Sequence, residues 1–526
     1  MLDYEAVPGS IILVDQDQEI VVSPIPSSDP DDPLNWSRNR KLLSMFCMVV
    51  YMVAIVVPSN SLYSIFSVLT EESGQTLDEL NQGTGYMFLF FGLGCLICQP
   101  LGQQYGKRPI YLLSVLGTLA VQLWSPYAKS QGAWIGSRIL QGALGAPMET
   151  MCEITISDVF FEHERGRWVG VYAFALMFSS YIAPLVAGFI AEGMNWKWVF
   201  YWGSIFNGVC LVFLFFFFEE TNYVREHVAQ PVPKEGSVLE GSSGSGDPEK
   251  IDDYSEGRSE SSLEHQQKPM KTYRQKLALW DKPRKNMLWE MFKRPFIIFF
   301  KFPPVVYAGF LYGSGIIFFN ILNASASMIL SAPPYNFKPS MVGLCYVSPI
   351  IVTFITSWYS GYLSDLLRIK LAKRNGGLSE PEHRLWIILI HIILNPAMLV
   401  LWGVGAYNGI HWIGPVIGMG IIGGLATIPA VSSVNYALDC YREIGSDSLV
   451  TLIVIRNCMS FGIGYGITPW ITREGLKNAF GEAAGVSAAC MGTFFIVLVV
   501  GKRMRKWTKK DYWNFVQKSI DNGMVH

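Results

Sequence analysis

Long apolar stretches alternate with short polar segments along the 526 residues of the chain. A helix that crosses a bilayer needs about 20 mostly apolar residues, and twelve stretches meet that requirement. Six of them precede a long polar segment and six follow it. The pattern therefore predicts an all-α membrane protein with twelve transmembrane helices in two six-helix bundles. The predicted spans are residues 42–63, 84–102, 109–127, 133–156, 168–190, 199–218, 303–328, 341–363, 385–406, 411–437, 449–471 and 483–501.

The polar segments add two tails and a central loop to the two bundles. The loop contains EGSSGSGDPEKIDDYSEGRSESSLEHQQKP, whose glycine, serine and charged residues cannot build a core. We expect a flexible tether, with phosphorylation of its serines as the alternative role. From Lys282 to Lys301 the residues are amphipathic and basic, which predicts a helix on the cytoplasmic face. The regions are an N-terminal tail (1–41), a first bundle (42–218), the loop (219–294), a second bundle (295–501) and a C-terminal tail (502–526).

Basic residues determine the expected orientation, because short cytoplasmic loops are enriched in lysine and arginine. With both termini in the cytoplasm, only five of the 41 lysines and arginines would lie outside. We therefore expect cytoplasmic termini and a multi-pass protein of the plasma membrane, with the vacuolar membrane as the alternative. The five outside residues are Lys129, Lys197, Lys338, Arg473 and Lys477.

Composition excludes several classes of function. Half of the residues are hydrophobic and 16% are charged, with a formal net charge of −1, so no basic excess is available for nucleic acid. The nine cysteines lie mostly in apolar runs and are expected to pack rather than to bind metal or carry redox chemistry. The chain has no G-x-x-x-x-G-K-[ST] motif, which leaves ATP drive unsupported. It also has no H-E-x-x-H motif or Ser–His pairing, so an enzyme is not expected.

Matching landmarks recur in the two bundles. QPLGQQYGKR (99–108) follows the second span, and GYLSDLLRIK (361–370) follows the eighth. Asp158 ends the fourth span and Asp439 ends the tenth. The recurrence indicates one six-helix unit used twice, with pseudo-symmetric halves, which is the layout of the major facilitator superfamily.

Specific motifs strengthen this resemblance. Residues 99–108 resemble the superfamily signature G-x-L-x-D-R-x-G-R-R, with Gln99 and Gln103 in place of its glycine and aspartate; the second copy keeps Gly361 and Asp365. Two motifs resemble signatures of drug:proton antiporters. In the fourth span they are Arg138, Gln141, Gly142 and Gly145, and in the fifth span SSYIAPLVAG (179–188), which contains Pro184.

Further motifs resemble the fungal twelve-span drug:proton antiporter-1 group. Within it, the chain is most similar to the branch that contains a yeast permease for histidinol and polyamines and presumed metabolite exporters. The motifs are DPLNWS (32–37), FEETNY (218–223), AKRNGGLSEPEHRL from Ala372, YALDCY (436–441) and GKRMRKWTKKDYW (501–513).

The resemblance implies a monomer in which spans one, four, seven and ten line a central cavity and the proton gradient supplies the energy, without a cofactor. The aspartate missing at Gln103 normally helps to lock one conformation. Arg456 could neutralise Asp365 or Asp439, or face the cavity. The residues expected to act in conformational gating are Gln103, Arg108, Asp158, Asp365, Asp439, Arg456 and Pro184.

Ionisable residues inside spans are costly to bury and are candidates for function. Glu149 and Glu153 lie one helical turn apart, and Arg138 lies eleven residues earlier on the same stripe, about 16 Å away. Glu149 is therefore not simply the counter-ion of Arg138. We expect Glu149 to carry the proton, or to share its carboxylate between proton and substrate, with Glu153 titrating beside it and Arg138 coupling the two movements. The alternatives are a structural network for Glu149 and helix pinning for Arg138; His391 is expected to pack.

Aromatic and amide side chains are the candidates for binding an organic solute. The predicted function is proton-coupled transport of a small organic solute, such as a drug, secondary metabolite or organic cation, with export favoured. The alternatives are import of polyamines or other organic cations and a non-transporting sensor. The sequon at Asn323 leaves glycosylation open. The expected cavity residues are Asn60, Tyr63, Tyr312, Asn320, Asn435 and Tyr436.

Overall fold

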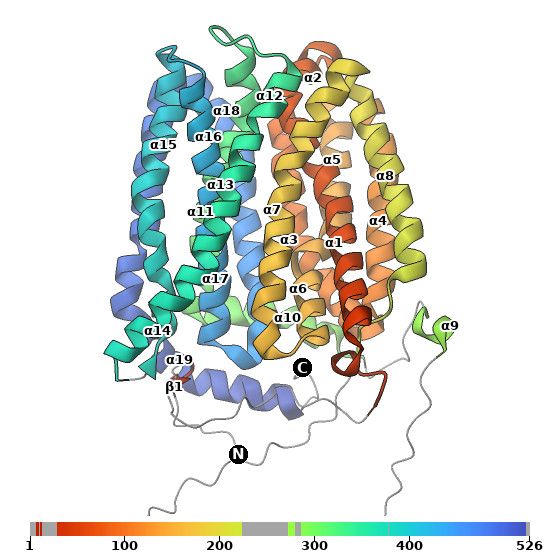
Figure 1. Cartoon of the computed structure of the whole chain (residues 1–526), viewed down its shortest axis with the longest axis vertical. Helices are drawn as coiled ribbons and strands as arrows, with labels where there is room; N and C mark the ends of the chain where they lie inside the picture. Colours follow the sequence, from red (N-terminus) through yellow and green to blue (C-terminus); the bar gives the residue numbers. More distant parts are fainter. Residues whose placement is uncertain are drawn as a thin grey trace, which may run out of the picture.

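Two helical bundles stand side by side in the computed structural model (Figure 1). The structure describes residues 7–9, 11–12, 29–223, 272–278, 286–376 and 378–521. Most of the predicted central loop, including 234–269, lies outside these residues. The first half contains α1 (Arg38–Asn60), α2 (Phe66–Ser73), α3 (Leu77–Tyr105), α4 (Lys107–Trp124), α5 (Gln131–Gly145), α6 (Pro147–Val159), α7 (Glu162–Gly193) and α8 (Trp196–Phe217).

The second half begins after two short connecting helices, α9 (Tyr273–Lys276) and α10 (Leu288–Lys301). The helix predicted between Lys282 and Lys301 is therefore present as α10, with aromatic side chains such as Trp289 and Phe300 exposed on it. The remaining helices are α11 (Pro303–Ser331), α12 (Pro339–Cys345), α13 (Val347–Trp358), α14 (Ser364–Arg374), α15 (Leu389–Tyr407), α16 (Ile413–Leu425), α17 (Thr427–Cys440), α18 (Gly445–Gly492) and α19 (Phe494–Asp521).

The predicted all-α membrane fold with twelve spans is confirmed. Among the described residues, ten helices are long and apolar enough to cross a membrane. That number omits the fourth span, which α5 and α6 form together, and takes the last two spans as one. The last two join because α18 continues through Gly475, whose φ of 78° marks the bend between them.

The two halves share a break in the corresponding span. The fourth span is interrupted at Ala146, directly before Pro147, and the tenth at Ala426, three residues before Pro429. A proline cannot donate the backbone hydrogen bond that would continue a helix. The break therefore follows from the local sequence in each half and agrees with the predicted repeat.

Glycines bring the halves into close contact. A Cβ atom at Gly464 of α18 would lie 2.6 Å from the Cα atom of Gly85 in α3, and one at Gly188 of α7 would lie 2.4 Å from the carbonyl oxygen of Pro339. Small residues allow helix backbones to approach in this way. The interface between the halves depends on them.

The two ends of the bundle differ in how the halves meet. We call the end at which α1 begins the inner end and the opposite one the outer end (Figure 1). Near the outer end, hydrogen bonds cross between the halves: Ser327 donates to Ser67 (3.0 Å), Asn81 to Thr468 (3.0 Å), and Tyr181 to the carbonyl of Gly423 (2.8 Å).

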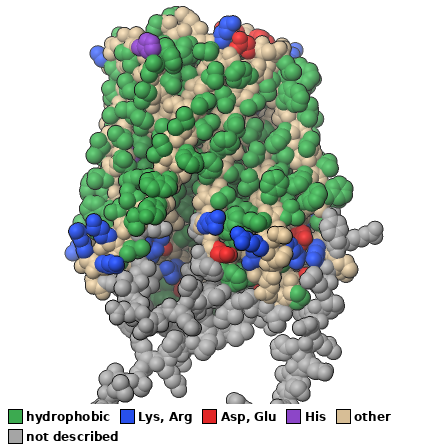
Figure 2. Space-filling model, in the orientation of Figure 1, with side chains coloured by type: hydrophobic (Ala, Val, Ile, Leu, Met, Phe, Trp, Pro, Cys, Tyr) green, Lys and Arg blue, Asp and Glu red, His purple; other side chains and the backbone are tan. Residues whose placement is uncertain are grey.

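At the inner end, the ion pairs Arg40–Glu219, Lys107–Asp158 and Arg384–Asp439 each join residues of one half. Figure 2 shows the surface hollowed between the halves toward this end, where the Lys and Arg side chains gather. These three ion pairs therefore do not join the halves, whereas the hydrogen bonds named above do.

We expect Gly464→Val to lower the melting temperature of the purified protein, because the added methyl groups would overlap the backbone of α3. Overpacking of this kind costs about 1–3 kcal/mol. Gly466→Val is the matched control, since a Cβ atom there meets nothing within 4 Å. Thermal unfolding of both variants in the same detergent tests the expectation, and equal melting temperatures would contradict it.

Candidate functional site

A buried ion pair connects the two halves. Glu149 lies in the first turn of α6, just after the break in the fourth span, and Arg456 lies in α18. Arg456 Nη2 is 2.5 Å from Glu149 Oε2, and the two side chains are 8% and 10% exposed. At this distance the attraction between the two charges offsets the cost of burying them.

The guanidinium of Arg456 has two further partners. It donates to the Tyr312 hydroxyl of α11 (3.2 Å) and to Oδ1 of Asn457 (2.9 Å), and it lies 5.0 Å from the centre of the Tyr312 ring. Tyr312 was an expected cavity residue, and the structure places it at the ion pair. Asn457 was missed, although an amide directly after an arginine inside an apolar span was a usable signal.

The structure corrects the role expected for Arg456. Asp439 is bonded to Arg384 (2.6 Å) and lies 3.7 Å from Arg368, so it is not the partner of Arg456. Asp365 belongs to α14, but its side chain lies outside the described part of the chain. Arg456 thus belongs to the central site rather than to the inner-end gate, because only the folded chain brings α18 against α6.

Glu153 differs from Glu149 in its surroundings. Its Oε2 atom is buried and has no hydrogen-bond partner among the described residues. Glu149 accepts a hydrogen bond from the guanidinium of Arg456, whereas Oε2 of Glu153 has a free position for a proton or a ligand. The sequence ranked Glu149 above Glu153 as the proton carrier; the geometry favours the reverse order.

Arg138 lies in α5, away from the acids. It is 1% exposed, donates to Oε1 of Gln141 (2.5 Å) and lies 4.2 Å from the ring centre of Trp134. Gln141 in turn donates to the Ser59 hydroxyl of α1 (3.1 Å). Within the described residues, the Nε and Nη2 atoms of Arg138 have no partner. Coupling and helix pinning both stay open for Arg138.

The expected cavity residues fall into two groups. Asn320 of α11 is 6% exposed, and neither its amide oxygen nor its amide nitrogen has a partner in the described structure, so it can bind a ligand without breaking a bond. Tyr436 of α17 is instead 0% exposed and packs edge-on against Tyr307 (6.4 Å). Tyr63 packs edge-on against Phe66 (5.8 Å). Asn60 and Asn435 are half-buried.

The structure bears on two further buried polar residues, Asn323 and His391. Asn323 is 0% exposed and accepts a hydrogen bond from the Tyr346 hydroxyl (3.1 Å), so its side chain lies inside the bundle, where a glycan has no room. His391 of α15 is also 0% exposed, which agrees with the packing role. Neither ring nitrogen of His391 has a partner among the described residues.

Each half has an aspartate in an ion pair at its inner end. Asp158 pairs with Lys107 in the first half, and Asp439 pairs with Arg384 and Arg368 in the second. Arg108 is 1% exposed and donates to the carbonyls of Phe218 (2.8 Å), Phe215 (2.6 Å) and Leu277. Arg108 therefore fixes the end of α8. Pro184 instead lies near the outer end, where its carbonyl accepts from Ser64 (2.7 Å).

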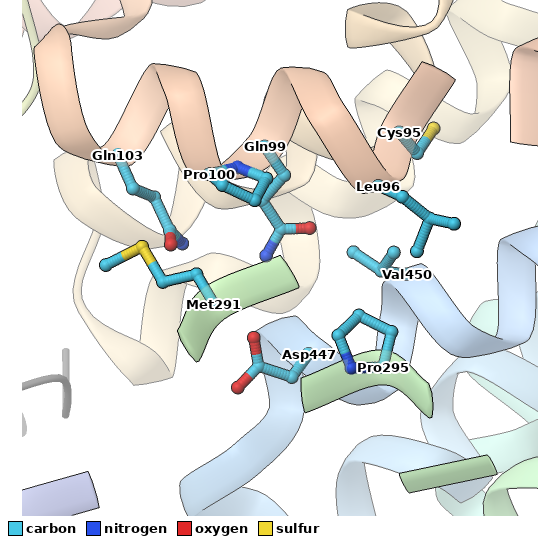
Figure 3. A pocket seen from close by; sticks show the side chains of 9 residues that line it. All are labelled: Cys95, Leu96, Gln99, Pro100, Gln103, Met291, Pro295, Asp447 and Val450. Carbon is cyan, nitrogen blue, oxygen red and sulfur yellow. The ribbon is translucent and has the colours of Figure 1, made fainter. Parts of the chain in front are cut away.

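A small pocket that is open to solvent lies where α3, α10 and α18 meet near the inner end. Gln99 and Gln103 extend from α3 toward the space that Met291, Asp447 and others line from the opposite side (Figure 3). Asp447, at the start of α18, is 2.6 Å from Arg294 of α10. The acid at this place is therefore contributed by α18, whereas the superfamily signature would place one at Gln103.

Two repeated six-span halves with a buried ion pair between them define a secondary transporter of the membrane. The chain belongs to the Major Facilitator Superfamily, whose family model matches residues 42–439. The protein is accordingly a transporter of small molecules in a lipid bilayer and not an enzyme.

Curated relatives extend over nearly the whole chain. An MFS-type transporter of Schizosaccharomyces pombe is 28% identical, over 97% of this chain and 95% of its own. Protein HOL1 of Saccharomyces cerevisiae is 26% identical, over 94% and 91%. The efflux pump vrtL of Penicillium aethiopicum is 24% identical, over 90% and 86%. The expected resemblance to fungal transporters is confirmed.

A solved structure shares the fold. The xylose transporter XylE from E. coli, in a partially occluded inward open conformation, matches with a TM-score of 0.56 and 10% sequence identity. The match covers 87% of this chain and 99% of that one. At this identity the similarity concerns the fold alone.

We expect the ion pair to show strong energetic coupling. Glu149→Gln or Arg456→Gln alone leaves a buried charge without its partner, which costs about 3–5 kcal/mol. The double variant should lose less than the sum of the two single variants. Unfolding free energies of the four proteins give the coupling energy.

The matched control is Lys301–Asp511, whose side chains are 53% and 52% exposed. Replacing this pair by Gln and Asn should change stability by less than about 1 kcal/mol. Additive losses at Glu149 and Arg456 would show that the two side chains are not energetically paired.

Proposed function

We propose that the protein exchanges protons for an organic solute that carries positive charge, by alternating access of one central site. The observation that carries this proposal is the excess acid beside the inter-half ion pair. Glu149 has Arg456 as its counter-ion, whereas the buried Oε2 of Glu153 has no partner in the described structure.

The charges of the site explain why proton and solute would exclude each other. With both acids ionised, Glu149, Glu153 and Arg456 leave one uncompensated negative charge in a region of low dielectric, which is unfavourable. Either a proton on Glu153 or a cationic group of the solute removes this charge. Binding of one ligand therefore weakens binding of the other, which is the thermodynamic requirement for exchange.

Neutral groups around the acid suit the rest of the solute. Tyr312 presents an aromatic ring beside the guanidinium. Asn320, whose amide has no partner among the described residues, lies on the same helix two turns away. An aromatic face attracts a cation, and an amide provides both a donor and an acceptor. The combination fits a protonated amine or another organic cation.

Export is the direction that this exchange favours. When the site faces a neutral cytoplasm, Glu153 loses its proton and binds the cationic solute; when it faces an acidic exterior, the proton displaces the solute. A proton gradient across the plasma membrane would drive export without a further cofactor. The similarity to a protein named an efflux pump supports this direction. Import of organic cations is the alternative, and it requires solute and proton to be bound together.

We expect Glu153→Gln to abolish proton-driven accumulation of an organic cation, because the neutral amide can neither release a proton nor attract the charge. Inside-out vesicles with an imposed pH gradient provide the measurement, with labelled spermidine and tetraphenylphosphonium as probes. The wild type should accumulate a probe only with the gradient, and Glu153→Asp should retain part of that activity.

The control is Glu192→Gln, at the outer end beside Lys338, which should transport like the wild type. Accumulation by Glu153→Gln at the wild-type level would exclude Glu153 as the exchange site. Loss in Glu149→Gln with full activity in Glu153→Gln would restore the order expected from the sequence. Gradient-driven movement in the opposite direction would favour import.

A further inference from the structure

The chain before α1 lies against the opposite half of the protein. α1 opens the first half at Arg38, yet β1 (Ile11–Ile12) pairs with β2 (Leu378–Ser379) of the second half. Figure 1 shows β1 beneath the second half, beside α19, while α1 begins under the first half. Pro8, Gly9 and β1 therefore contact the second half, although the helix α1 belongs to the first.

Strand pairing and a side-chain hydrogen bond hold this segment. The strands pair in antiparallel register, with Ile11 opposite Ser379 and Ile12 opposite Leu378. The carbonyl oxygen of Pro8 accepts a hydrogen bond of 2.6 Å from Arg505 Nη1. Main-chain pairing of this type is a recurrent way to bind an extended peptide at an exposed strand edge.

Arg505 is the anchor of the contact. Its side chain is 0% exposed and forms ion pairs with Glu380 (2.6 Å) and Glu382 (2.8 Å), and Lys502 also bonds to Glu380 (2.6 Å). The Pro8 carbonyl supplies an acceptor for an N–H group of this buried guanidinium.

The position of Gly9 admits only a residue without a side chain. Its φ is 82°, and a Cβ atom there would lie 2.6 Å from the carbonyl oxygen of Asp439 and 3.1 Å from the Cα atom of Cys440. A side chain at this position would both strain the backbone and collide with the end of α17. The surface thus accepts a segment that has glycine at one defined place.

We propose a binding surface for an extended peptide on the second half, formed by β2, Glu380, Pro381, the end of α17 and Arg505. Its ligand is the N-terminal segment of the same chain, which contacts the surface through Pro8, Gly9 and β1. The ligand covers Asp439, which with Arg384 forms the inner-end ion pair of the second half. Closing the inner end brings the end of α17 toward the first half, so the bound segment stabilises the arrangement in which this end is open. This inference rests on alternating access but not on proton coupling.

Peptide binding to the full transporter lacking residues 2–12 tests the surface directly. A fluorescent peptide of residues 1–14 should bind with saturable anisotropy, and the same peptide with Gly9→Val should bind at least tenfold more weakly. The Arg505→Lys transporter should also bind the first peptide more weakly, because lysine cannot reproduce the directed N–H groups. Absence of saturable binding, or equal binding of the two peptides, would overturn the proposal.

A second measurement uses the intact chain and needs no truncation. Spin labels at the exposed Arg167 and Leu366, with the exposed Cys458 replaced by Ser, report the separation of the halves at the inner end. Gly9→Val should shift the distances toward a closed inner end and change the transport rate. Gly74→Val is the control, since Gly74 has a similar φ of 73° and meets nothing within 4 Å.

Unchanged distances in Gly9→Val, together with wild-type transport, would show that the segment does not act on the gate. The distance measurement tests the N-terminal segment independently of the proposed exchange mechanism. Failure of proton-driven transport in the wild type would refute the exchange mechanism and leave the distance shift unaffected.

Discussion

The arrangement of the central region depends on one interaction, the buried ion pair between Glu149 and Arg456. Either charge alone inside the bundle would cost several kcal/mol, and only α6 beside α18 allows the two to compensate each other. Tyr312 and Asn457 hold the guanidinium from two other directions. Any movement of the halves must therefore preserve this pair or offer Arg456 another anion, and Glu153, one turn along the same helix, is placed to be that anion.

The rest of the interface suits a protein that must move. Between the halves, α3 meets α18 and α7 meets α12 through close contacts of glycine with backbone, and the aromatic pair Tyr86–Phe461 lies beside the contact of α3 with α18. Hydroxyl and amide hydrogen bonds add to these contacts near the outer end, where they can exchange with water when the halves separate. Such contacts give close packing without the penalty of separating buried charges.

The inner end follows a different rule. Its ion pairs at Asp158 and Asp439 stay within one half, so the halves can separate there without breaking them. Two described parts outside the membrane-spanning helices contact the bundles at this end: Pro8 accepts from Arg505 of the second half, and α10 lies where α3 and α18 meet.

The amino-acid sequence by itself determined the helical fold, the twelve spans, their division into two related halves and the set of buried ionisable residues. Those properties depend on local composition and spacing, because an apolar run of sufficient length has only one stable form in a bilayer. The tertiary structure alone decided which buried charges are paired. Arg456 and Glu149 lie 307 residues apart, and no periodicity relates them.

Sequence spacing placed Arg138, Glu149 and Glu153 on one stripe. It could not show that Arg138 binds Gln141, that Glu149 has a cation from the other half, or that Oε2 of Glu153 has no partner in the described part of the chain. The same holds for residues 7–12, whose sequence contains no sign that Arg505 and the end of α17 receive them. Spacing along a helix specifies a face, whereas the charge balance at that face depends on the helices that pack against it.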